Sequence, residues 1–211
     1  MKKSLFSGIV LAVLLIFSTT TSQAIMIGFE PMSQVVGVGD SVDVDLFISG
    51  LGDGVAPSLG VFDLDITYDP TILAFADYQL GPYLGNPDAF PLLEALDWSL
   101  GEYSSGVINI YELSLLDANS TSGPFYIPPY LEDLQPDSFT LATLTFNTLA
   151  VGTSPLNINS GYWLGDENGD QLTATLESGS ISPVPEPATL LLLGSGLAGI
   201  FGLGRKRWLR S

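Results

Sequence analysis

Apolar and polar residues alternate along several short stretches in the middle of the chain. The alternation is clearest at 41–48 and 59–68, where aspartate, serine or threonine separates most of the apolar residues. The apolar positions are Val42, Val44, Leu46 and Ile48 in the first stretch and Phe62, Leu64, Ile66 and Tyr68 in the second. Because successive side chains of a strand point to opposite faces, this period predicts two half-buried strands.

The rest of the middle region predicts further short strands and no long helix. Strands are expected at 25–29, 107–116, 139–148, 156–158, 162–164, 172–176 and 179–182, and the segment 92–100 fits a short helix or an irregular strand. A single helical turn is expected at Asp69, which can cap it, with Pro70 at the first helical position. Many short alternating strands indicate an all-β domain, an antiparallel β-sandwich or jelly roll.

Two long segments between these strands, 81–105 and 117–137, are rich in proline and aromatic residues. Loops of such length are typically functional or mobile. The aromatic residues that stand out are Tyr78, Tyr83, Trp98, Tyr103, Tyr126, Tyr130, Tyr162 and Trp163. Such rings suit a sugar-binding platform or a protein interface. The favoured alternative is that Trp98 and Trp163 close the ends of the sandwich.

The N-terminal end of the chain has a different pattern. A basic start, Lys2-Lys3, precedes an apolar run from Leu5 to Phe17, and small residues lead up to Ala24. This predicts a secretory signal peptide at 1–24, cleaved after Ala24. The domain that is exported would then span 25–183.

The C-terminal segment 184–211 has three parts. Pro185-Glu186-Pro187 cannot continue a strand or a helix interior. The 17 residues from 188 to 204 carry no charge, and as a helix they would span about 25 Å, enough for a short transmembrane helix. A basic cluster follows, which is expected to stay on the cytoplasmic side: Arg205, Lys206, Arg207 and Arg210.

This tail resembles the PEP-CTERM sorting signal of Gram-negative bacteria, through Val184-Pro185-Glu186-Pro187, the glycine-rich span and the basic cluster. The resemblance implies processing by an exosortase-like membrane enzyme, in a bacterium that makes exopolysaccharide. It implies an address and not an activity. The expected localisation is the inner membrane, facing the periplasm, and then the cell surface or extracellular matrix.

The charges are divided sharply between the ends and the middle. All six lysines and arginines lie in the two end segments, whereas only Glu186 of the 23 acids lies outside 25–183, which leaves 22 acids and a formal charge of −22 there. No lysine–carboxylate or arginine–carboxylate pair can form within the domain, so its carboxylates must be solvated, hydrogen-bonded to the backbone or metal-bound. Nucleic acid is excluded as a partner, and neutral or cationic partners are favoured.

The residue types also limit the chemistry. The chain has no histidine or cysteine, and the domain has no lysine, so sites that depend on these groups are unavailable. No pattern ties two carboxylates together as a glycosidase pair. We therefore predict a non-catalytic domain without a cofactor.

Calcium is the one candidate ligand with a local motif. Asp166, Asn168 and Asp170 place oxygen ligands at alternate positions, as at the start of a calcium loop, and Gly169 allows a sharp turn. Glu177 occupies position 12 but falls in a predicted strand. The favoured alternative is a polar Asn-Gly hairpin turn.

The middle region also resembles a cohesin domain. The segment 38–44 and the strand that ends in Tyr68-Asp69-Pro70 resemble its N-terminal half, and 141–145, the turn 166–170 and 177–181 resemble its C-terminal half. The resemblance implies a jelly-roll sandwich of about nine strands that binds a protein partner through one sheet face. Because 78–105 and 117–137 depart from the pattern, no partner-contacting residue is assigned, and dockerin binding is not expected.

These observations favour an exported adhesion or scaffold module of the cell surface or matrix, whose partner is an unknown surface protein or polysaccharide. Two alternatives stay open. One is a carbohydrate-binding module for exopolysaccharide, and the other is a matrix protein whose acids are bridged by calcium.

Overall fold

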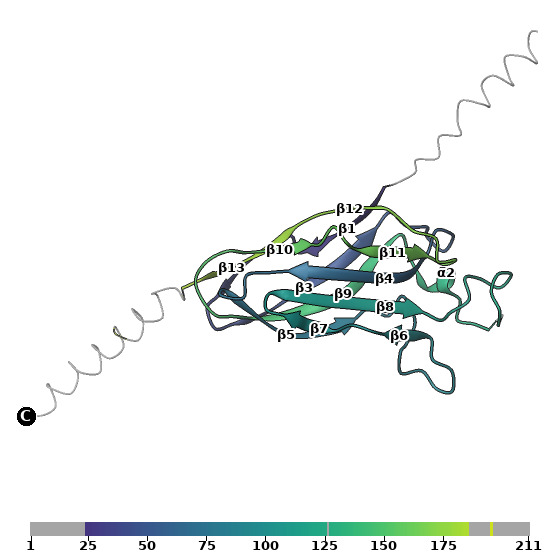
Figure 1. Ribbon diagram of the computed structural model, residues 1–211, viewed down its shortest axis with the longest axis horizontal. Helices are drawn as coiled ribbons and strands as arrows, with labels where there is room; N and C mark the ends of the chain where they lie inside the picture. The colour runs from purple at the N-terminus through teal and green to yellow at the C-terminus, as the bar shows by residue number, and fades with distance from the viewer. Residues whose placement is uncertain (1–23, 126, 186–194, 196–211) are drawn as a thin grey trace, which may run out of the picture.

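The computed structural model describes residues 24–125, 127–185 and 195, and places two β-sheets face to face (Figure 1). The five-stranded sheet has the order β12 (Ala174–Leu176), β1 (Ile25–Glu30), β3 (Ser41–Ser49), β9 (Ser138–Thr148) and β5 (Leu73–Leu80). The eight-stranded sheet has the order β2 (Ser33–Gly37), β13 (Gly179–Val184), β10 (Ser154–Ile158), β4 (Leu59–Thr67), β8 (Val107–Ser114) and β6 (Ala95–Asp97). In addition, β11 (Trp163–Asp166) pairs with β4, and β7 (Gly101–Ser104) pairs with β8.

The core lies between the inner faces of the two sheets. The predicted apolar sides of β3 and β4 are buried as expected, and β9 adds Leu144 and Phe146 from the five-stranded sheet. Each such side chain contributes about 1.5–3 kcal/mol when it is fully buried. An extra residue in β9, at the register shift opposite Leu46 and Phe47, lets Leu141 and Ala142 both reach the interior.

The β-sandwich prediction is confirmed, but its strand number and pairing need correction. The described residues form thirteen strands and not about nine, because β2, β5 and β7 were not expected and 95–97 is a strand. Two of the pairings are parallel, β1 with β12 and β2 with β13, so the sandwich is not purely antiparallel. In β5 a bulge between Phe75 and Asp77 disrupts the alternation that makes a strand recognisable in a sequence.

The segment after β4 forms the single capped helical turn that the sequence predicts, because the backbone N of Leu73, four residues on, donates to Asp69 O at 3.0 Å. Asp69 Oδ1 accepts hydrogen bonds from the backbone N of Thr71 at 2.9 Å and from its Oγ1 at 2.6 Å, and these bonds lower the pKa of Asp69. The backbone N of Ile72 and of Leu73 donates to Asp69 O. The capping role of Asp69 is therefore correct. The long segment 117–137, which was expected to be a loop, contains the four-residue helix α2 (Leu131–Leu134).

The two predicted end segments lie largely outside the described residues. Ala24 is exposed just before β1, and Val184 is the last residue of β13, so the final strand runs one residue past the expected domain end. Within the part of the chain that the structure describes, no helix is long and apolar enough to cross a membrane. The span predicted at 188–204 falls outside that part.

Candidate interaction surface on the eight-stranded sheet

Four side chains form a row across the outer face of the eight-stranded sheet. Trp163 on β11 pairs with Asp63 on β4, Asp63 pairs with Tyr111 on β8, and the backbone N of Trp98 donates to Tyr111 O at 2.8 Å. Neighbouring strands lie about 4.8 Å apart, so this aromatic row spans about 14 Å. Trp98 is 49% exposed and Trp163 is 44% exposed, so nearly half of the surface of each residue is accessible to a partner.

The tryptophan after β6 is held rigidly. Its ring meets that of Tyr111 edge to face, with centroids 5.2 Å apart and an interplanar angle of 87°. Ser99 closes the turn that follows, because its backbone N donates to Asp97 Oδ1 and its Oγ accepts from Tyr111 N at 3.0 Å. A fixed ring loses less conformational entropy on binding than a mobile one, which favours a recognition role.

A polar network lies beside the aromatic row on the same face. Asn109 Nδ2 donates to Asp63 Oδ1 at 2.7 Å and to Asp65 Oδ1 at 3.1 Å, and Tyr103 OH donates to Asp65 Oδ2 at 3.0 Å. The hydrogen bond to Asp65, followed by desolvation, raises the pKa of Tyr103. The network orients two carboxylates toward solvent without any cationic partner from the domain itself.

Glu112 lies directly beneath this surface and faces the core. It follows Tyr111 on β8, shares the inner side with Ile108 and Ile110, and pairs with Phe62 on one side and Asp97 on the other. The side chain is fully buried, and neither carboxyl oxygen has a hydrogen-bond partner among the described residues. Burial, and then repulsion from Asp97, raises the pKa of Glu112 to about 8, so the group is mostly neutral at pH 7.

The aromatic residues singled out in the sequence divide into two groups. Trp98, Tyr103 and Trp163 are exposed on the outer face, so the expectation that Trp98 and Trp163 close the ends of the sandwich is wrong. The others have structural contacts: Tyr83 packs on Phe139 with centroids 4.7 Å apart, Tyr162 OH donates to Ala174 O, and Tyr78 OH donates to Asp97. Tyr130 is the residue before α2, and Tyr126 lies outside the described residues.

The candidate calcium residues form a hairpin turn. Asp166 Oδ1 accepts from the backbone N of Asn168 at 2.8 Å and of Asp170 at 2.9 Å, and Gly169 has a φ of 83°. This is the geometry of a polar Asn-Gly turn, the alternative to a calcium loop. In the described ranges no three or more acidic side chains are grouped so that they could hold a metal ion. A calcium role for Asp166, Asn168 and Asp170 stays a prediction.

The row and its network were only partly visible in the sequence. Asp63 and Asp65 were recognised as the polar side of a strand, and Tyr111 and Asn109 fall in a predicted strand, but none was singled out. Their alternation with Ile108 and Ile110 is the signal that places them on the outer face. What brings them together is the register between β4 and β8, which periodicity within one strand cannot give.

Solved structures with a similar fold are cohesin modules. The sixth cohesin of scaffoldin B from Acetivibrio cellulolyticus, solved with a mutant Cel5 dockerin, matches with a TM-score of 0.57 and 18% identity over 77% of this chain and 100% of that chain. An OlpA cohesin from Clostridium thermocellum, in complex with a dockerin, gives 0.56 and 14% over 77% and 100%. A non-cellulosomal cohesin from the archaeon Archaeoglobus fulgidus gives 0.53 and 16% over 77% and 92%. The chain therefore contains a cohesin-like domain.

The C-terminal tail has its own match. Residues 183–207 match the family model described as the PEP-CTERM protein-sorting motif, which confirms the predicted resemblance. Of the residues assigned to this motif, Val184 and Pro185 are described, whereas Glu186, Pro187 and the basic cluster lie outside the described residues. The comparison with curated proteins found no match.

Proposed function

We propose that this chain is an exported, non-catalytic protein of the cell surface or extracellular matrix whose sandwich binds a protein partner through the aromatic row. The observation that carries the proposal is the in-register placement of Trp163, Tyr111 and Trp98 on one exposed sheet face. Tryptophan and tyrosine are the residues most enriched among those that dominate binding energy at protein interfaces. The cohesin-like fold supports the same reading.

The export part of the proposal rests on the two ends of the chain. The PEP-CTERM motif at 183–207 supports sorting, and the apolar N-terminal run supports a cleaved signal peptide. An exosortase-like enzyme would process the chain near Pro185-Glu186-Pro187, while Arg205-Lys206-Arg207 keeps the tail oriented. Before processing, the domain would face the periplasm from the inner membrane.

A carbohydrate ligand is the second candidate function. Half-exposed tryptophans can stack on sugar rings, and the oriented oxygens of Asp63 and Asp65 can accept hydrogen bonds from sugar hydroxyls. The same face would then recognise the exopolysaccharide of the producing cell. A protein partner is favoured because no cationic side chain of the domain screens these carboxylates from a basic interface residue.

Binding of the labelled full chain to cells of the producing strain that lack this protein separates these functions. We expect binding to be lost after the cells are treated with protease and retained after their polysaccharide is digested. Loss on polysaccharide digestion alone would favour the carbohydrate function, and loss in chelator alone would favour the calcium-dependent one. The matched control is the double variant Thr143→Ala, Thr145→Ala on the opposite outer face, which should bind like the unchanged protein.

A further inference from the structure

A second exposed surface, distinct from the aromatic row, lies at one end of the sandwich. Residues 89–94 after β5 and residues 115–117, 125 and 127–129 after β8 line a groove of about 610 Å³. Its large apolar side chains are strongly exposed: Phe90 94%, Phe125 68%, Leu92 62%, Leu93 50%, Ile127 50% and Leu115 40%. The volume falls within the range of about 300–1,000 Å³ that is typical of binding pockets, and exposed apolar surface of this kind marks interaction sites.

Hydrogen bonds fix the two walls of this apolar groove. The backbone N of Leu115 donates to Glu94 O at 2.7 Å, and the side chain of Glu94 accepts from the backbone N of Asn86 at 2.9 Å. Directly after α2, the buried side chain of Gln135 forms hydrogen bonds with both backbone groups of Leu59 and with Tyr83 O. The bases of the two walls are therefore joined by hydrogen bonds within the fold.

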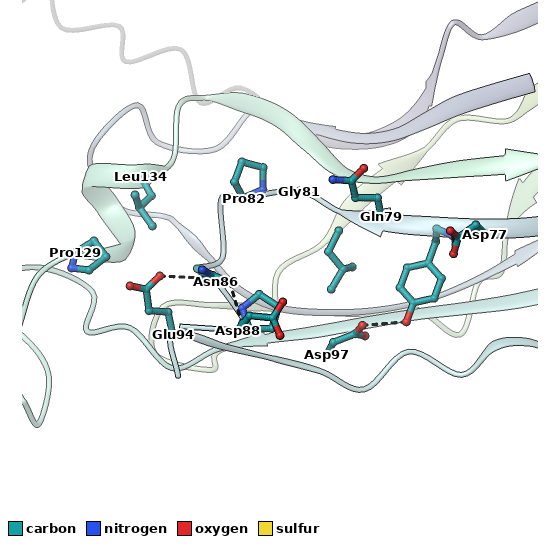
Figure 2. A pocket seen from close by; sticks show the side chains of 14 residues that line it. Asp77, Gln79, Gly81, Pro82, Asn86, Asp88, Glu94, Asp97, Pro129 and Leu134 are labelled. Carbon is teal, nitrogen blue, oxygen red and sulfur yellow. Dashed lines mark hydrogen bonds between the residues drawn. The ribbon is translucent and has the colours of Figure 1, made fainter. Parts of the chain in front are cut away.

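An acidic hollow adjoins the groove and shares Glu94 and Pro129 with it. The hollow has a volume of about 800 Å³ and lies between β5 of one sheet and β6 of the other. Figure 2 shows Asp77 and Asp97 at one end of the hollow, and Asp88 and Glu94 at the other end, where Pro129 lies. The domain has no lysine, arginine or histidine, so no basic side chain of its own can neutralise these four carboxylates.

The two surfaces together define the chemistry of an occupant. The groove removes apolar side chains from water, and the hollow beside it attracts positive charge. A segment with leucine-like residues on one side and lysine or arginine on the other satisfies both at once. An anionic segment or an anionic polysaccharide would meet uncompensated carboxylates, which costs affinity.

We propose that this end of the sandwich docks a cationic amphipathic segment of another protein, with its apolar side chains in the groove and its basic side chains over the acidic hollow. The site differs from the aromatic row, because it uses the loops after β5 and β8 and the hollow between the edge strands β5 and β6, and not the outer face of the eight-stranded sheet. A second copy of the chain is disfavoured, since it would bring two acidic domains together.

The position of the groove also favours a partner outside this chain. The two loops that line the groove lead into β6 and α2. These elements lie at the opposite end of the sandwich from the end of β13, where the sorting motif lies (Figure 1). A chain held at β13 would point this end away from its own attachment point. The groove is therefore presented to a partner arriving from outside.

The test is a titration of the full chain in phosphatidylcholine nanodiscs with a fluorescent 18-residue leucine/lysine amphipathic peptide, followed by anisotropy against empty discs. We expect saturable binding that weakens as sodium chloride is raised from 50 to 500 mM, and at least about tenfold weaker binding for Phe90→Ser with Leu92→Ser. Both side chains are exposed, so the variant should fold. Asp77→Asn with Asp88→Asn should reduce the salt dependence.

Matched controls decide the interpretation. The double variant Leu149→Ser, Val151→Ser makes the same change at exposed residues near the end of β13, where Gly152 N donates to Pro183 O, and should bind normally. Equal binding of a leucine/glutamate peptide, or no binding at all, would overturn the proposal. It is also overturned if a peptide of residues 188–211 binds better than the generic peptide, or if the chain self-associates through Phe90. A Trp98→Ala, Trp163→Ala variant that loses cell binding but still binds the peptide would show that the two surfaces act separately. The peptide titration therefore tests the groove, and the cell assay tests the proposed function.

Discussion

The two outer faces of the sandwich differ in what their side chains do. On the five-stranded sheet, Thr143 Oγ1 donates to Asp45 at 2.5 Å and Thr145 Oγ1 donates to Asp43 at 2.7 Å, so hydroxyls and carboxylates satisfy one another across the strands. Of the large apolar side chains that are exposed in the described residues, none comes from this sheet. On the eight-stranded sheet, carboxylates are instead paired with an amide, and half-exposed tryptophans flank them.

The polar groups on the outer face of the five-stranded sheet are matched with one another, whereas the outer face of the eight-stranded sheet keeps apolar surface exposed. A threonine–aspartate pair needs no partner beyond water, because its donor and acceptor are already matched. The aromatic row exposes apolar area that a partner could cover. The domain thus has one outer face whose polar groups are matched with one another and one outer face with exposed apolar area.

The largest expected effect comes from removing the rings of the row. Trp98→Ala with Trp163→Ala should weaken binding to the cell-surface partner at least about 100-fold, because interface tryptophans commonly contribute 2 kcal/mol or more each. The measurement is the apparent Kd of the labelled full chain on cells. A change of less than about threefold would mean that the two faces do not differ in function.

The next effect concerns the buried carboxyl beneath the row. The ordinary pKa of Glu112 is 4.5, and its folded pKa is about 8, so between these values the folded protein holds a proton that the unfolded chain has lost. Stability should therefore fall as pH rises through this window and level off above about pH 8. The slope contributed by this group approaches about 1.4 kcal/mol per pH unit.

Urea unfolding from pH 4.5 to 9 measures this contribution as a difference between two proteins. In Glu112→Gln that slope should disappear, because the amide does not titrate. The control Glu102→Gln, an exposed residue of β7, should keep it. Parallel curves for the unchanged protein and Glu112→Gln would contradict the assignment.

A smaller effect is expected on the opposite face. Thr143→Val removes one hydrogen bond to Asp45 but keeps the β-branched shape, so we expect a loss of about 0.5–1 kcal/mol in the free energy of unfolding. Binding to cells should not change. If the Thr143→Val protein unfolds normally but no longer binds cells, the partner binds the five-stranded sheet and not the aromatic row.

The smallest effect is expected at the hairpin turn. Asp166→Asn keeps an oxygen that can accept from Asn168 N and Asp170 N, so stability should change by less than about 0.5 kcal/mol. If calcium raises the melting temperature of the unchanged protein and not that of Asp166→Asn, the turn is a calcium site. Equal responses of both proteins would remove this candidate.

The sequence predicted burial best where the alternation within a single strand is enough to identify its inner face. The buried faces of β3 and β4 were predicted correctly, because alternation alone separates Val44 or Leu64 from the aspartates beside them. By the same logic, Glu112 shares the period of Ile108 and Ile110 and could have been recognised as an inward carboxyl. The C-terminal sorting motif was also predictable from its own local pattern, whereas the signal peptide at 1–24 stays a prediction.

The rest depends on contacts between segments that are far apart. Trp98 was assigned to the ends of the sandwich, and only the pairing of 95–97 with β8 shows that it stands beside Tyr111. The groove unites Phe90 and Phe125, which no local period connects, through the bond between Leu115 and Glu94. Bulges and irregular loops carry these contacts, and they are the features that patterns predict least well.

The end of β13 has a mechanical consequence. Val184 lies within the matched sorting motif at 183–207 and is still paired with Gly37 of β2, and Val38 N donates to Val184 O at 3.0 Å. No slack chain separates the last sheet hydrogen bonds from the motif. If the tail is held in a membrane as proposed, a pull on it runs along β13, and the parallel pairing with β2 loads its hydrogen bonds together instead of opening them one by one. Such a joint resists a pull along the strand, because several hydrogen bonds must break at once.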